Sequence, residues 1–208
     1  MILLFDSLLI TKYFSYLVPI VIFYKNRIEL NEFKSLNTFL FISLILSLVE
    51  RLVCLQFESA ISIFHLSIPI RFFYMYRIFL LEKSIKRLRY YPVLISLIIF
   101  LFETIICNGW LKNNEIQTVY VNICTAVISG IILMNHLKTN DQKEVLYKFL
   151  IYGSFLFVSA SSLILSLYET EIRQSPSMMA FFMIVIYNSV EIVQNLSIAF
   201  SLWKLKEA

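Results

Sequence analysis

The chain alternates along its whole length between long apolar segments and short polar ones. Each apolar segment holds about 20 residues, enough for an α-helix to cross the hydrocarbon core of a bilayer. A transmembrane β-barrel would instead show segments of about ten residues with alternating apolar and polar positions. The pattern therefore predicts an all-α, polytopic membrane protein with seven transmembrane helices, at residues 3–24, 36–55, 60–81, 91–108, 116–137, 146–168 and 178–203.

The connections between these segments are short, so consecutive helices are expected to be antiparallel neighbours in a single transmembrane domain, residues 1–208. The first segment lacks a basic start and a small-residue cleavage site, and it contains Asp6 and Lys12. We therefore interpret it as an uncleaved first helix and not as a signal peptide.

Lys and Arg residues are distributed unevenly between the two ends of the segments. Twelve lie in or beside the first, third and fifth connections and in the tail: Lys25, Arg27, Lys34, Lys83, Lys86, Arg87, Arg89, Lys138, Lys143, Lys148, Lys204 and Lys206. The other connections hold two, Lys112 and Arg173. Because cytoplasmic loops carry the excess of Lys and Arg, the N-terminus is predicted outside and the C-terminus in the cytoplasm. This alternation requires an odd number of helices.

The composition supports a membrane protein and argues against a nucleic-acid partner. Hydrophobic residues make up 59% of the 208 residues and charged residues 15%, whereas soluble domains average about 45–50% and about 25%. The net charge is +4, but the basic residues lie in clusters between apolar segments. Membrane orientation explains that pattern better than nucleic-acid binding.

Several polar residues fall inside the predicted helices, where a charge costs at least about 2.5–3.5 kcal/mol and normally has a partner in the bundle interior. They are Lys12, Glu50, Arg51, His65, Arg71, Arg77, Glu103, Asn122, Asn188, Glu191, Gln194 and Asn195. The helix rise places most of the charges in the outer half of the bilayer, with Arg71 and Glu191 deepest. Asn188, Glu191 and Asn195 are spaced so that they share one helix face.

Two interpretations of these residues remain open. In the first, a buried ion pair, Arg71 with Glu50 or with Glu191, fixes the register of the helices. In the second, Glu50, Arg71, Glu191, Asn188, His65 and Glu103 line an outward-facing polar pocket for a ligand, protons or ions. Glu103 is the residue that we expect most to lie at the lipid headgroups. The small residues of the sixth helix, at 153–166, predict close helix packing, with a movable helix as the alternative.

Several familiar chemistries lack their residues in this sequence. Retinal proteins have a lysine in the middle of the last helix, where this chain has Glu191, and two histidines, His65 and His136, cannot supply a usual zinc site. No Gly-x-Ser or paired-glutamate protease motif is present. The three cysteines, Cys54, Cys107 and Cys124, lie in apolar segments and are interpreted as small buried side chains, a Cys54–Cys107 disulfide being the alternative. We therefore expect no enzyme activity, no metal and no cofactor.

Residues 64–79, FHLSIPIRFFYMYRIF, resemble the third helix of a family of small seven-helix membrane proteins of Bacteroidota. The serine-rich segment 149–163 and the richness in Ile, Lys and Asn are similar to that family too. Arg71 stands where the family is expected to have an acidic residue. Family members are often encoded beside sensor histidine kinases, so the resemblance implies a bacterial inner-membrane protein with a signalling partner such as a sensor kinase.

The leading hypothesis is therefore a receptor-like signalling protein. Glu50, Arg71 and Glu191 would form an outer-half pocket for a small ligand, and the basic loops would contact a cytoplasmic partner. A small-solute or proton-coupled transporter that uses Arg71 and Glu191 is the first alternative. A structural subunit of a membrane complex, which needs no pocket, is the second.

Overall fold

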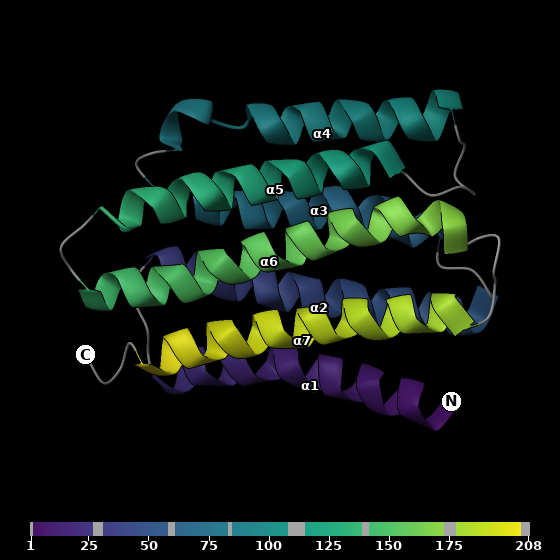
Figure 1. The fold of residues 1–208 in the computed structure, drawn as a ribbon, viewed down its shortest axis with the longest axis horizontal. Helices are drawn as coiled ribbons and strands as arrows, with labels where there is room; N and C mark the ends of the chain where they lie inside the picture. The colour runs from purple at the N-terminus through teal and green to yellow at the C-terminus, as the bar shows by residue number, and fades with distance from the viewer. Residues whose placement is uncertain are drawn as a thin grey trace. The chain divides into compact units, whose positions relative to one another are not determined.

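The computed structural model describes residues 2–26, 31–57, 61–82, 85–107, 115–138, 142–172 and 178–204. These residues are almost entirely helical, which confirms the predicted all-α class (Figure 1). The α-helices are α1 (Ile2–Lys25), α2 (Asn31–Phe57), α3 (Ile61–Phe79), α4 (Tyr91–Phe102), α5 (Glu115–His136), α6 (Gln142–Ile172) and α7 (Met178–Lys204). A 3-10 turn, η1 (Lys86–Leu88), precedes α4, and a π-helical turn, η2 (Glu103–Cys107), follows it.

Each predicted apolar segment corresponds to one of these helices, with differences at the ends. The helices α2 and α6 are longer than their apolar segments, because polar residues such as Asn31 and Gln142 can belong to a helix without belonging to a membrane span. The predicted segment 91–108 is divided, since α4 ends at Phe102 and continues as the π-helical turn η2. Hydropathy indicates where a helix is apolar, but it does not predict where the backbone hydrogen bonds change from the α-helical to the π-helical pattern.

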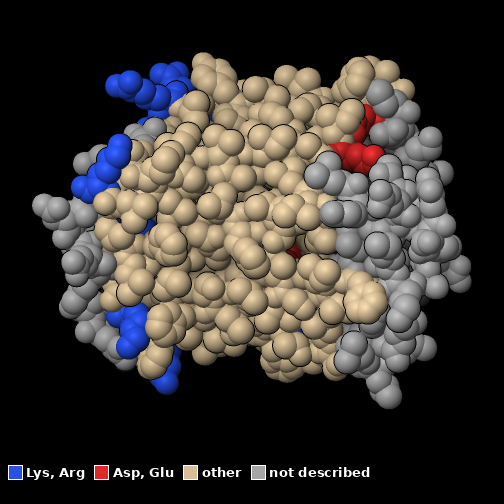
Figure 2. Space-filling model, viewed as in Figure 1, with Lys and Arg blue, Asp and Glu red and all other residues tan. Residues whose placement is uncertain are grey.

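By length and composition, four helices within the described residues are apolar enough to cross a membrane. Their apolar stretches are Ser7–Lys25, Phe33–Val53, Glu115–His136 and Val145–Leu165, and a shorter one covers Tyr91–Ile106. Large apolar side chains lie exposed along the helices, among them Ile98 at 65% and Ile105 at 71%. On the face drawn in Figure 2, Lys and Arg side chains lie near the helix ends, and none lies along the helix middles. These features indicate a membrane protein.

The helices form two compact units, and each is described by itself. One comprises Met1–Ile28 and Thr125–Ala208, and the other comprises Glu29–Cys124. The boundary falls inside α5, so the first ten residues of this helix belong to the second unit.

In the first unit, α7 packs against both α1 and α6. Asn26, just after α1, donates a hydrogen bond to the carbonyl of Leu202 near the end of α7 (3.4 Å), so these two helices run in the same direction. The Tyr147 hydroxyl, near the start of α6, donates to the carbonyl of Lys204 (3.2 Å), so α6 runs antiparallel to α7. Buried apolar side chains along the contacts form the core: Tyr16, Ile20, Phe23, Ile151, Tyr152, Phe155, Ile198, Ala199 and Leu202.

In the second unit, α2 packs against α3, and α3 packs against α4. Glu103, just after α4, accepts hydrogen bonds from the N–H groups of Ile116 and Gln117 at the start of α5. The hydroxyl of Tyr120, further along α5, donates to the carbonyl of Pro92 at the start of α4 (3.2 Å), so the first part of α5 runs antiparallel to α4. The core of this unit is rich in aromatic and long aliphatic side chains, namely Leu36, Leu40, Phe72, Tyr76, Ile78, Phe79 and Phe100. Each unit thus supplies facing helices on which buried polar side chains can meet.

Candidate functional site

A buried ion pair links the first and last helices of the first unit. The ammonium Nζ of Lys12 on α1 lies 2.5 Å from Oε2 of Glu191 on α7, and these side chains are 10% and 6% exposed. The same ammonium lies 5.7 Å from the ring centroid of Tyr187, one helical turn before Glu191, within the range of a cation–π interaction. Lys12 therefore sits between a carboxylate and an aromatic face on α7.

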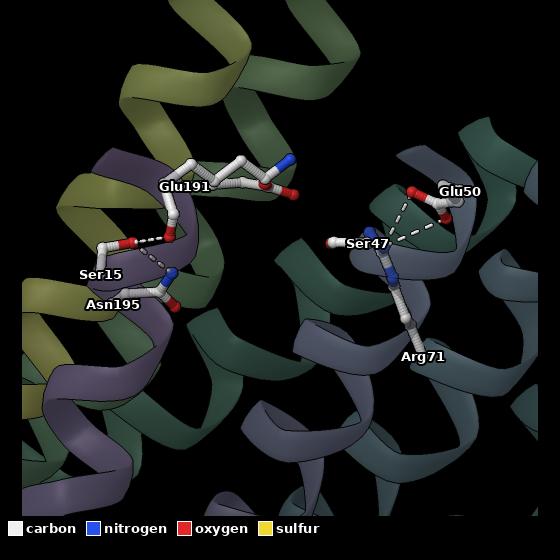
Figure 3. Close-up of polar contacts among 7 residues, drawn as sticks. Ser15, Ser47, Glu50, Arg71, Glu191 and Asn195 are labelled. Carbon is white, nitrogen blue, oxygen red and sulfur yellow. Dashed lines mark hydrogen bonds and ion pairs between the residues drawn. The ribbon is translucent and has the colours of Figure 1, made fainter. Parts of the chain in front are cut away.

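Neutral polar groups extend this contact along the two helices (Figure 3). The Ser15 hydroxyl donates to the carbonyl of Lys12 (2.6 Å) and accepts a hydrogen bond from Nδ2 of Asn195 (2.9 Å). Asn188, Glu191 and Asn195 are all buried, as expected for residues on one helix face. The polar stripe of α7 is therefore enclosed, and two of its members contact α1.

A second ion pair lies between α2 and α3 in the other unit. Nη2 of Arg71 donates to both carboxylate oxygens of Glu50, each at 3.1 Å, and to the hydroxyl of Ser47 at 3.0 Å (Figure 3). Ser47 and Glu50 are three residues apart and so lie on the same face of α2. The Arg71 side chain is 20% exposed and that of Glu50 is 10% exposed. This pair is thus more open than the pair on α1 and α7.

Each unit therefore contains an ion pair that includes predicted site residues. Within the second unit, Arg71 is paired with Glu50, one of the two partners considered for it. The carboxylate of Glu191 instead meets Lys12, which sequence reasoning had noted as a charge inside the first helix without assigning it a partner. The sequence does contain a signal for the Lys12–Glu191 pair. Both residues lie about a dozen residues into helices that run in the same direction, and because the rise per residue is equal, they lie at similar depth.

Glu103 has a different role from the one expected. Its side chain is completely buried, and its two carboxylate oxygens accept hydrogen bonds from the backbone N–H groups of Ile116 and Gln117, each at 2.8 Å. The carboxylate thus caps the first turn of α5, where N–H groups lack partners within the helix and a negative charge is favourable. The alternative in which Glu103 contacts lipid headgroups is not supported, because its carboxylate is enclosed and bonded to α5. Hydropathy alone could not show that the start of α5 packs against Glu103.

Gln117 is a buried polar residue that the sequence did not single out. It is fully buried, and its Nε2 lies 3.4 Å from both the carbonyl and the hydroxyl oxygen of Ser96 on α4. Together with the Glu103 cap, this contact fixes α4 against the start of α5. No apolar periodicity in the sequence distinguishes Gln117 from an exposed glutamine.

Two further expectations concern histidine and cysteine. The side chain of His65 lies outside the described residues, as do those of Cys54 and Cys107, whereas Cys124 is a free, half-buried thiol. Across the part of the chain that the structure describes, no three His, Cys, Asp or Glu side chains are grouped closely enough to hold a metal ion.

Comparison of the chain with protein-family models, with curated proteins and with solved structures gives no match.

The Lys12–Glu191 pair generates a prediction about stability. Replacing either residue alone (Lys12→Met or Glu191→Leu) leaves one buried charge without its partner, so each should lower the free energy of unfolding by about 3–5 kcal/mol. The double variant should lose clearly less than the sum of the two, which can be measured by titrating the protein from mild detergent into SDS. The exposed Lys25→Met serves as the control and should change stability by less than about 0.5 kcal/mol. Additive losses would contradict the pairing.

The Glu103 cap makes a local prediction. Glu103→Ala removes the acceptor of two N–H groups and should cost about 1–3 kcal/mol of stability. Glu103→Gln keeps one acceptor oxygen and should cost less. Hydrogen exchange at the amides of Ile116 and Gln117 should become faster in both variants, and more so in Glu103→Ala than in Glu103→Gln. Unchanged exchange at these two amides in Glu103→Ala would show that Glu103 is not the cap.

Proposed function

We propose that this chain is a receptor-like signalling protein of the bacterial inner membrane. In this proposal seven helices cross the membrane, a small ligand binds at the Arg71–Glu50 pair, and the signal passes to a cytoplasmic partner. The observation that carries the proposal is the partial exposure of Arg71 within an otherwise enclosed ion pair.

The seven-span topology draws support from the pairing of charges. Four helices are apolar enough to cross a membrane. Arg71 and Glu191 are charges inside α3 and α7, and each meets an opposite charge on a neighbouring helix. Neutralisation removes much of the cost of placing such helices in hydrocarbon. The orientation, N-terminus out and C-terminus in, follows the excess of Lys and Arg at one set of helix ends.

The ligand site is proposed at Arg71, Glu50 and Ser47. A guanidinium recognises carboxylate and phosphate groups through charge-assisted hydrogen bonds. An anionic or zwitterionic ligand that reaches the exposed part of Arg71 would compete with Glu50 for the guanidinium and so loosen the α2–α3 contact. The Lys12–Glu191 pair, at 10% and 6% exposure, is better enclosed and suits a fixed tie between α1 and α7. The ligand site therefore contains fewer residues than the pocket expected from the sequence.

The output is proposed to pass through the basic ends of the helices. Lys25, Arg77 and Lys138 are exposed there and could contact acidic groups of a cytoplasmic protein. The resemblance to a family often encoded beside sensor histidine kinases makes such a kinase the first partner to test.

A proton-coupled transporter is the second candidate, and one observation favours it. Lys12 and Glu191 are a directly contacting pair of titratable groups, deep in helices α1 and α7, with Tyr187 and Asn195 close by. Paired ionisable groups of this kind occur in proton pathways across membranes. A purely structural subunit remains the third candidate.

The proposed topology can be tested by cysteine labelling in a variant without Cys54, Cys107 and Cys124. Glu115→Cys lies at the start of α5 and should react with a membrane-impermeant maleimide added to intact spheroplasts. Lys25→Cys, at the end of α1, should react only after the membrane is opened. The reverse result would invert the orientation, and labelling of both positions from outside would exclude an odd number of spans between the two positions.

The ligand site is tested by comparing two charge-neutral double variants. Small carboxylates and amino acids that raise the melting temperature of the wild type should fail to stabilise Arg71→Met/Glu50→Leu, because the guanidinium that binds them is gone. The matched control Lys12→Met/Glu191→Leu removes the other pair and should keep the response. Equal loss in both variants would contradict a site at Arg71.

Proton movement distinguishes the two leading candidates. Proteoliposomes loaded with the pH-sensitive dye pyranine should show no protein-dependent proton flux under a pH gradient if the chain is a receptor. A flux that Glu191→Gln abolishes would instead support the transporter.

A further inference from the structure

The turn between α3 and α4 presents a group of exposed basic side chains. Lys86 and Arg87 belong to the 3-10 turn η1, and Arg89 follows it directly; all three are exposed. Within the described ranges, no side chain forms an ion pair or hydrogen bond with these three groups. The preceding acidic residue, Glu82, is buried. The turn therefore offers positive charge that its own surroundings leave available.

The turn is held in place by contacts on its inner side. Ile85 is 1% exposed, and its N–H donates to the carbonyl of Glu82 (3.1 Å). The N–H of Leu88 donates in turn to the carbonyl of Ile85 (2.9 Å). Beyond the basic residues, the ring of Tyr90 stacks on Phe73 of α3, with centroids 6.1 Å apart and an interplanar angle of 21°. The basic side chains thus project from a backbone that is fixed at both ends.

An exposed apolar strip begins at the same turn and continues along α4. Leu88 and Tyr91 are exposed beside the basic residues, at 41% and 59%. Exposed apolar side chains cover most of α4, and Leu94, Ile98 and Leu101 among them follow Tyr91 along one helix face. Ten residues of helix from Tyr91 cover about 15 Å, the thickness of the hydrocarbon in one leaflet. Positive charge therefore lies at one end of an apolar strip as long as an acyl chain.

We propose that this surface, Lys86–Leu88 with Arg89, Tyr91 and the exposed face of α4, binds an anionic phospholipid. The phosphate would contact Lys86, Arg87 and Arg89 through charge-assisted hydrogen bonds, and an acyl chain would lie along α4. An acidic surface of a soluble protein would match the charges but would leave Leu88 and the strip on α4 without a partner. The site requires only that α4 lies in the membrane, so it is independent of ligand binding at Arg71.

Lipid retention measured by native mass spectrometry tests the proposal on the full chain in detergent. The wild type should bind phosphatidylglycerol in preference to phosphatidylcholine. Each basic residue near an anionic headgroup contributes about 1 kcal/mol, so Arg87→Gln/Arg89→Gln should weaken phosphatidylglycerol binding about 25-fold. Binding of phosphatidylcholine should stay unchanged.

Two control variants separate a local site from general attraction and from misfolding. Lys25→Gln/Lys138→Gln removes two exposed charges at other helix ends. Because salt screens exposed charges that lie outside the site, this variant should weaken phosphatidylglycerol binding less than about threefold. Arg87→Lys/Arg89→Lys keeps the charge and should retain most of the affinity.

Three results would overturn the proposal. Equal losses in the two glutamine variants would show diffuse electrostatic attraction without a site. A loss in the lysine variant as large as in Arg87→Gln/Arg89→Gln would show that the positive charge of the turn is not what binds the headgroup. Competition by soluble glycerol 3-phosphate as strong as that by phosphatidylglycerol would identify a site for free phosphate esters, in which the strip on α4 plays no part.

Discussion

A charged side chain inside hydrocarbon must find an opposite charge, and this constraint shapes both units of the protein. Water is absent there, so the desolvation of an ammonium, guanidinium or carboxylate group is offset only by close contact with a partner. Lys12 meets Glu191 in one unit, and Arg71 meets Glu50 in the other. Each pair joins two different helices, so satisfying the charges also fixes which helices are neighbours and at what register. The apolar packing around the pairs is nondirectional and could not do this alone.

The two pairs satisfy the constraint to different degrees. The Lys12–Glu191 contact is short, enclosed and extended by Ser15 and Asn195. The Arg71–Glu50 contact is longer and leaves a fifth of the Arg71 side chain exposed. A closed pair stabilises one arrangement of its helices, whereas a partly exposed pair can exchange its partner for a competing anion. This contrast is the physical basis for proposing a ligand site between α2 and α3 and a structural tie between α1 and α7.

The sequence predicted the helices well and their contacts poorly, for one reason. A span of about 20 apolar residues is a local property, and every predicted segment corresponds to a helix, although the π-helical turn after Phe102 was missed. Choosing a partner for a charge requires knowledge of which helices pack together, and that depends on surfaces far apart in the chain. Arg71 was assigned two alternatives, and Lys12 none. Glu103 shows the same limit, because the N–H groups that donate hydrogen bonds to its carboxylate belong to the next helix, and hydropathy does not predict how that helix packs.

The parallel arrangement of α1 and α7 has a consequence for how the protein is made. The contacts between these helices join residues 180 positions apart, such as Ser15 and Asn195, so α1 leaves the ribosome long before α7 exists. At about 5–20 residues per second, the interval is on the order of 10–35 s. During that time the ammonium of Lys12 has no Glu191 to neutralise it, and a flexible lysine chain in this state extends toward the headgroups. If the membrane topology is as proposed, with α7 spanning the bilayer, we expect the first helix to reach its final depth only after the last helix has been inserted.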